Sequence, residues 1–130
     1  MRKILRAGLL VLLAFTAAPR VKAGPNGCTT DGTLVPMGDE QIAVSSTAIG
    51  FTAAKIAPSG GPQAVYAIFS VETNAIRYRD NGLAPTASVG LPMASGSNWT
   101  VCGVTTISRA LFIRQSADAT VSVSYYRQGN

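Results

Sequence analysis

The sequence contains no histidine, and this absence removes several classes of chemistry at once. A Ser-His-Asp triad, a histidine-ligated metal site and an imidazole pH switch all need that side chain. With only two cysteines in the chain, a zinc site is not expected either. We therefore predict that the protein holds neither a metal ion nor a cofactor.

Charged residues are also scarce. They make up 13% of the chain, against about 25% in ordinary globular domains. The acidic side chains are too scattered to nominate a catalytic carboxylate pair or a calcium-binding loop: Asp31, Asp39, Glu40, Glu72, Asp80 and Asp118. We predict no catalytic residues and do not expect an enzyme.

The formal net charge of +5 belongs to the amino-terminal segment alone. The first 23 residues contain five basic side chains and no acid, and the rest of the chain has six bases and six acids. A nucleic-acid-binding surface needs an excess of positive charge, and the body of the protein has none. No nucleic-acid partner is predicted.

Residues 1–23 follow the plan of a secretory signal peptide. A basic start, residues 1–6, precedes an apolar run from Ala7 to Ala18, and small residues favour cleavage after Ala23. Because this run is shorter than the ~20 residues that span a bilayer, we expect export and no other membrane association. The alternative is a start at Met37, which would give an intracellular product.

The two cysteines, Cys28 and Cys102, predict a disulfide if the protein is exported. Free or intermolecular thiols are the alternative. A bond between them would tie a loop-rich amino-terminal segment, residues 24–40, to a central strand. Closing so long a loop is worth about 4 kcal/mol in the chain-entropy model.

Residues 41–130 read as short strands joined by glycine and proline turns, which predicts an all-β fold. The expected strands lie at residues 41–45, 64–72, 75–79, 98–102, 110–114 and 120–125. Both faces of 64–72 are largely apolar, so we expect this strand to be central and covered on both sides. No segment of the body predicts a helix. The pattern favours a single β-sandwich or jelly-roll-like domain of about seven to nine strands.

A small set of basic and aromatic residues forms the candidate contact surface. Arg77 and Arg79 share one face of their strand, and we expect Arg114 and Arg127 to join them across neighbouring strands. Tyr126 is the aromatic residue best placed for exposure. Val121, Val123 and Tyr125 take the inward positions of its strand, so Tyr126 falls on the outward face. The alternative is an ordinary solvated sheet face.

So little charge leaves a surface rich in alanine, serine, threonine, glycine and glutamine. A small β domain of this kind suits packing against copies of itself or against another protein, which would cover its strand edges. We therefore expect protein partners and a homo-oligomer.

Several strings of the body resemble small proteins encoded by tailed bacteriophages and prophages, within about Gln41 to Arg127. They are Tyr66–Thr73, Ala75–Gly82, Ala84–Gly90, Phe112–Gln115 and Val121–Arg127. The resemblance implies a non-enzymatic virion protein of the capsid-decoration, connector or fibre category, located in the virion and bound to other virion subunits. The export signal departs from that pattern. It favours the alternative of a β-sandwich binding module in the periplasm, at the cell surface or outside the cell.

Overall fold

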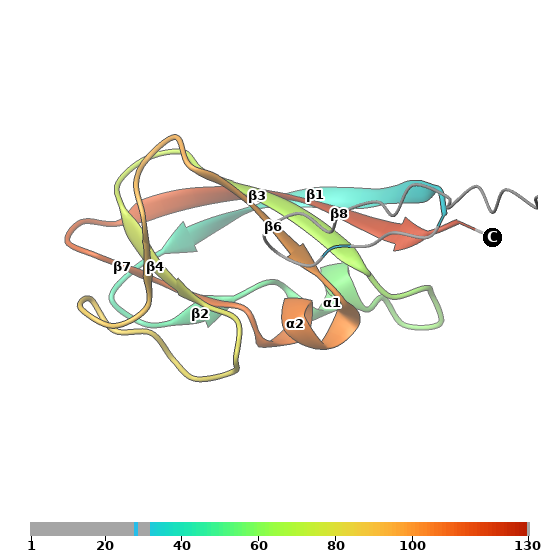
Figure 1. Ribbon diagram of the computed structural model, residues 1–130, viewed down its shortest axis with the longest axis horizontal. Coiled ribbons are helices and arrows are strands. Elements are labelled where there is room, and N and C mark those ends of the chain that lie inside the picture. Colours follow the sequence, from blue (N-terminus) through green and yellow to red (C-terminus); the bar gives the residue numbers. More distant parts are fainter. Residues whose placement is uncertain (1–27, 29–31, 130) are drawn as a thin grey trace, which may run out of the picture.

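The computed structural model describes Cys28 and residues 32–129, which form two antiparallel sheets of four strands each (Figure 1). Sheet A has the strand order β1 (Leu34–Val44), β8 (Ala119–Gln128), β3 (Tyr66–Val71) and β6 (Asn98–Cys102). Sheet B has the order β2 (Ile49–Gly50), β7 (Leu111–Arg114), β4 (Ile76–Arg79) and β5 (Leu91–Met93). The predicted all-β sandwich is confirmed, with eight strands in the part of the chain that is described.

The alternation of apolar and polar residues in the sequence decides which face of each strand is buried. In β8, Val121, Val123 and Tyr125 are buried, whereas the residues between them are half-buried on the outer face. In β4, Ile76 and Tyr78 point inward and the two arginines outward, as predicted. Each strand therefore contributes one apolar face to the space between the sheets.

Aromatic rings fill the centre of this space. The ring of Phe112 on β7 lies 5.0 Å from that of Phe69 on β3 and 5.1 Å from that of Phe51, measured between centroids. Phe51 also contacts the ring of Tyr125, at 5.6 Å, and Tyr78 contacts both Phe69 and Phe112. Rings from the two sheets thus interlock in one cluster, mostly in edge-to-face geometry.

Two short helices correct the expectation that the body has none. They are α1 (Ala53–Ile56) and α2 (Val104–Arg109). Each is shorter than two turns, so neither produces the 3.6-residue apolar period by which a helix is recognised in a sequence. Within residues 32–129 no helix is long and apolar enough to cross a membrane.

The first strand begins earlier than predicted. β1 starts at Leu34, so residues 34–40 of the segment expected to be loop-rich are paired with β8. The register shifts between Pro36 and Gly38, where the chain bulges. A proline, a glycine and the bulge interrupt the alternation that identifies a strand, which is why the sequence pattern placed the start near residue 41.

The strand predicted at 64–72 is covered on one face only. β3 lies between β8 and β6 and buries Ala67, Phe69 and Val71 against the other sheet. Its opposite face belongs to the outer surface of sheet A, where Ile68 is 38% exposed. The second apolar face predicted here is therefore a surface and not a second core.

The predicted disulfide between Cys28 and Cys102 is present, with the two Cα atoms 5.5 Å apart. Cys102 ends β6, which is an edge strand of sheet A and not the central strand that we expected. The bond therefore fastens the amino-terminal side of the domain to that edge. The predicted signal peptide, residues 1–23, lies outside the described residues.

Candidate functional site

The outer face of sheet A carries small polar side chains in rows that cross the strands. The strand register sets Gln41 of β1 beside Ser122 of β8, then Ser70 of β3 and Asn98 of β6. The next row is Asp39, Ser124, Ile68 and Thr100. These residues occupy the outward positions of the strands, and the inward positions of the same strands form the core.

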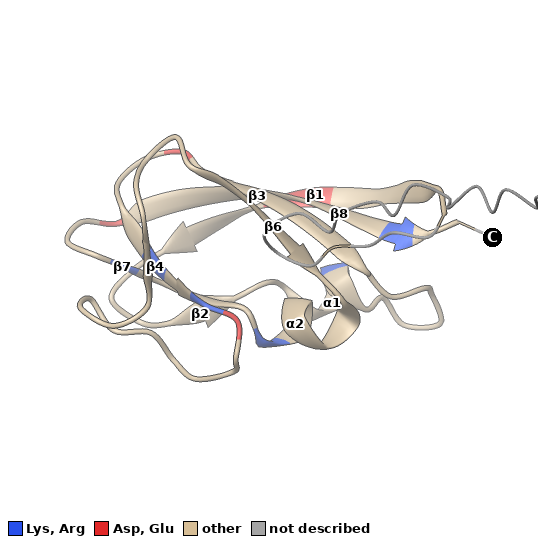
Figure 2. Ribbon diagram, viewed as in Figure 1, with Lys and Arg blue, Asp and Glu red and all other residues tan. Residues whose placement is uncertain are grey.

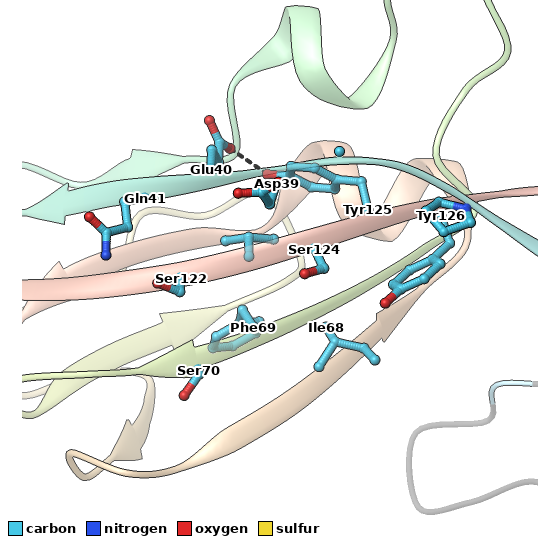
Figure 3. Close-up of a pocket in the computed structure, with 13 residues that line it drawn as sticks. Asp39, Glu40, Gln41, Ile68, Phe69, Ser70, Ser122, Ser124, Tyr125 and Tyr126 are labelled. Atoms are coloured by element: carbon cyan, nitrogen blue, oxygen red, sulfur yellow. Dashed lines mark hydrogen bonds between the residues drawn. The ribbon is translucent and has the colours of Figure 1, made fainter.

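A shallow open trough of about 510 Å³ runs over this face, along β1, β8 and β3 (Figure 3). Its central residues are Ser70, Ser122 and Ser124, whose short side chains leave the sheet surface low between the neighbouring strands. Ile68 and Tyr126 add apolar surface to the lining. The trough offers hydroxyl groups and some apolar area, which suits contact with another polypeptide surface.

Contacts between neighbouring strands lie at both ends of the trough, with hydrogen bonds at one end and a ring contact at the other. Near one end Glu72 accepts hydrogen bonds from the Ser122 hydroxyl and from Gln41 Nε2, the latter at 3.2 Å. At the other end the rings of Tyr66 and Tyr126 meet edge to face, with centroids 5.9 Å apart. These contacts link β1, β8 and β3 across the face, so the trough is a fixed feature of the sheet.

Glu40 lies at the rim of the trough, where β1 faces α1. Its Oε1 accepts hydrogen bonds from the Tyr125 hydroxyl and, at 3.0 Å, from the Thr52 backbone amide. Partial burial raises the pKa of Glu40, but the hydrogen bonds from Thr52 and Tyr125 and the charge of Lys55 outweigh it and leave the pKa below its usual 4.5. Burial and the same carboxylate raise the pKa of Tyr125, which therefore remains a hydrogen-bond donor.

Replacing Glu40 by glutamine is expected to lower the free energy of unfolding by about 1 kcal/mol at pH 7, because the amide accepts weaker hydrogen bonds than the carboxylate. A carboxylate with a lowered pKa in the folded state stabilises the fold above pH 4.5, and the contribution is lost as pH falls through the folded-state pKa. Urea unfolding at pH 7 and pH 3 should therefore show a difference between wild type and Glu40→Gln that shrinks at pH 3.

The neighbouring carboxylate supplies the control for this pH test. Asp39 points to the outer face, so Asp39→Asn should change stability by less than about 0.5 kcal/mol at either pH. An unfolding difference for Glu40→Gln that is the same at both pH values would contradict the role given to the ionised Glu40.

The five residues predicted as a contact surface are divided between the two sheets. Arg77, Arg79 and Arg114 belong to sheet B, whereas Tyr126 and Arg127 lie on β8 of sheet A. Because the neighbours of β8 are β1 and β3, the expectation that Arg127 joins Arg77 across neighbouring strands is wrong (Figure 2). Sequence periodicity gives the face of a residue within its strand, but it does not give the sheet in which that strand lies.

Three of these arginines make contacts within the domain, and the simplest is that of Arg127, whose Nη1 donates to the carbonyl of Gln128 at 3.2 Å. Arg77 donates through Nε to the carbonyl of Ala87, at 3.2 Å, and through Nη1 to that of Gly90, at 3.1 Å, so it holds the loop between β4 and β5. Arg114 forms an ion pair with Asp118 at 2.6 Å. Tyr126, in contrast, lines the trough, as expected of a half-buried residue on the outer face.

Sequence periodicity did not identify the other trough residues, although part of the signal was present. In β8 the outward residues Ser122, Ser124 and Tyr126 are all polar or amphipathic, which indicates a solvent-accessible face. The residues that complete the trough come from β1 and β3, and only the observed strand order brings them beside β8.

No family model, curated protein or solved structure matches this chain. Within the described residues, no group of three or more cysteine, aspartate or glutamate side chains is arranged to hold a metal ion.

Proposed function

We propose that this chain is a non-enzymatic structural protein that acts by assembling with other protein subunits through the outer face of sheet A. The observation that carries the proposal is the open trough with its three serines, Ser70, Ser122 and Ser124, whose charged lining residues, Asp39 and Glu40, both lie on β1 at one side. Burying small hydroxyl groups requires far less desolvation than burying charges, so such a face can be covered by a partner at low free-energy cost.

The class of partner comes from the resemblance of residues 41–127 to small virion proteins of tailed phages. On this basis the partners are other virion subunits, in the capsid-decoration, connector or fibre category, together with further copies of this chain. The virion exterior is an oxidising environment, and a disulfide between Cys28 and Cys102 persists there.

The same disulfide also favours a second candidate function, an exported β-sandwich binding module of the periplasm or the cell surface. Mass spectrometry of the natural protein separates the two. A mature amino-terminus at Gly24 in a periplasmic or secreted fraction supports the exported module. Recovery of the chain from purified particles, with capsid or tail proteins, supports the virion protein.

Placing a long charged side chain in the trough is expected to abolish assembly and leave the fold intact. Ser124→Arg puts a guanidinium on the low part of the face, where it blocks a partner sterically and adds a charge that the partner would have to desolvate. Loss of binding should be at least about 100-fold, equivalent to about 2.7 kcal/mol. Cosedimentation with particles lacking the chain, and sedimentation velocity of the isolated protein, measure the two kinds of assembly.

The matched control is Ser59→Arg, the same change at an exposed loop position away from the trough. Both variants should unfold within about 0.5 kcal/mol of the wild type, as surface substitutions do. If Ser124→Arg assembles as well as Ser59→Arg, the trough is not the contact surface. If the wild type is monomeric at high concentration and joins no particle, the structural function itself is wrong.

A further inference from the structure

A second region with the features of a binding site lies at the edge of the sandwich where β6 of sheet A faces β4 and β5 of sheet B. Trp99 on β6 is half-buried there and lines three adjoining hollows. The hollow toward β4 measures about 360 Å³ and the one toward β5 about 300 Å³, and these two share Trp99 and Leu91. Volumes of this size fall at the lower end of the range of small-ligand sites, about 300–1,000 Å³.

Tyr78 provides an unsatisfied hydrogen-bonding group beside Trp99. The residue is 3% exposed, and its hydroxyl has no hydrogen-bond partner within the described part of the chain. Burial and the nearby Asp80 carboxylate raise the pKa of this phenol, so the hydroxyl keeps its proton and is a donor as well as an acceptor. A buried polar group without a partner is destabilising, so in this position it points to a function.

The remaining side chains around the hollow toward β4 are either charged and polar or apolar, and Arg79 supplies a guanidinium to the first kind. Asp80 and Asn81 place a carboxylate and an amide there, and the Asp80 carboxylate makes no hydrogen bond or ion pair with the described residues. Val89 and Leu91 supply apolar surface and are 50% and 43% exposed. The hollow therefore combines an indole ring, apolar edges, a carboxylate, a guanidinium, an amide and a phenol.

This combination matches the chemistry of a sugar ring. A pyranose has an apolar C–H surface that packs on an indole, and hydroxyl groups around its edge that donate to carboxylates and bond to amides and phenols. The Asp80 carboxylate and the Arg79 guanidinium balance in charge, which favours a neutral ligand, and a purely apolar ligand would leave Asp80 and Tyr78 unpaired. The paired hollows that share Trp99 and Leu91 accommodate adjacent units of a chain.

We propose that the hollows around Trp99 bind a short neutral oligosaccharide, with the sugar packed on the Trp99 indole and hydroxyls bonded to Asp80 and Tyr78. This site lies at the β5–β6 edge, away from the trough, so sugar binding is a further activity beside assembly. It gives the protein a means of attaching to a polysaccharide surface.

Trp99 is the single tryptophan of the chain, so tryptophan emission, excited selectively above the absorption band of the four tyrosines, reports on this site alone. Titration of the folded, disulfide-bonded protein with cellotriose, chitotriose and maltotriose, each to about 20 mM, covers the millimolar affinities usual for weak ligands. We expect a saturable change in emission with at least one of them, together with protection of Trp99 from quenching by acrylamide. No saturable change with any of the three would overturn the proposal.

Two variants keep the test specific. Asp80→Asn should weaken binding of the active sugar by about tenfold, the effect of one hydrogen bond to a charged group. Tyr78→Phe should weaken binding several-fold while the melting temperature stays unchanged or rises, because the variant removes a buried hydroxyl that has no partner in the free protein. A side chain with a merely structural role would not combine weaker binding with unchanged stability.

Ser124→Arg is the control, because it alters the trough and leaves the Trp99 hollows as they are. It should bind the sugar like the wild type even if assembly is lost, so the two proposals fail separately. If sugar affinity is the same in Asp80→Asn, Tyr78→Phe and wild type, the site is not the one proposed. If Trp99 emission responds saturably only to peptides, the hollow is a peptide site and the saccharide proposal is wrong.

Discussion

Replacing Cys102 by serine is expected to lower the free energy of unfolding by about 4 kcal/mol, which corresponds to a fall in melting temperature of about 15–30 °C. The two cysteines are 74 residues apart, and the bond therefore removes much of the conformational freedom of the unfolded chain. In the folded state the bond also holds the Cys28 side of the chain to β6, at the edge of sheet A. Thermal unfolding followed by circular dichroism measures the change.

Chemical reduction provides the internal control. Wild type in excess dithiothreitol, Cys28→Ser and Cys102→Ser should unfold at similar temperatures, and the reductant should have no further effect on either variant. A wild type whose unfolding is insensitive to reductant would contradict a stabilising role of the bond. This outcome would be expected for a product that starts at Met37, because such a chain lacks Cys28.

A start at Met37 would also damage sheet A directly. Leu34, Val35 and Pro36 pair with residues 126–128 of β8, so their removal would leave that end of β8 without a partner on the β1 side. The pairing begins before Met37 and continues after it, across the bulge. The first strand is therefore complete only in the longer product.

The sandwich could be predicted because most of its strands show an alternation of apolar and polar residues within their own sequence. In β8 and β4 each buried residue alternates with an outward one, and this period of two is visible in the sequence without knowledge of the partners. The helices α1 and α2 and the first part of β1 are short or interrupted, so they leave no such period. The local sequence pattern therefore predicts the fold class, but it does not reveal the short or irregular elements.

The candidate site could not be predicted, because it depends on contacts between distant parts of the chain. Glu72 bonds to Ser122, 50 residues later, and to Gln41, 31 residues earlier. Nothing in the three local sequences indicates that β8 lies between β1 and β3. The misplaced arginine cluster has the same cause, since Arg77 and Arg127 were each assigned to an outer position without knowledge of the sheet.

Phe112→Ala is the core substitution with the largest expected effect. The Phe112 side chain is fully buried on β7 and contacts the rings of Phe51, Phe69 and Tyr78. Its removal leaves a cavity between the sheets, and such changes reduce the free energy of unfolding by about 3–5 kcal/mol. Small domains are stable by only about 5–15 kcal/mol, so the variant should be close to unfolding at 37 °C.

The matched control is Ile68→Ala, a large-to-small change on the outer face of sheet A. Ile68 is 38% exposed, so the control should lower stability by less than about 1 kcal/mol. Urea unfolding of both variants measures the difference. Equal effects would mean that the outer face is as well covered as the interior, which would contradict the one-sided packing of β3.

The position of Phe112 also predicts which strands are destabilised when its ring is removed. Phe112 belongs to sheet B, but its closest ring contact is Phe69 of sheet A, so the ring joins the two sheets. A domain with one shared core unfolds as a unit, and amide hydrogen exchange should therefore accelerate in β3 and β8 as much as in β4 and β7. Faster exchange confined to sheet B would show that the sheets unfold independently. In that case sheet A, which carries the trough, would keep its stability without the aromatic cluster.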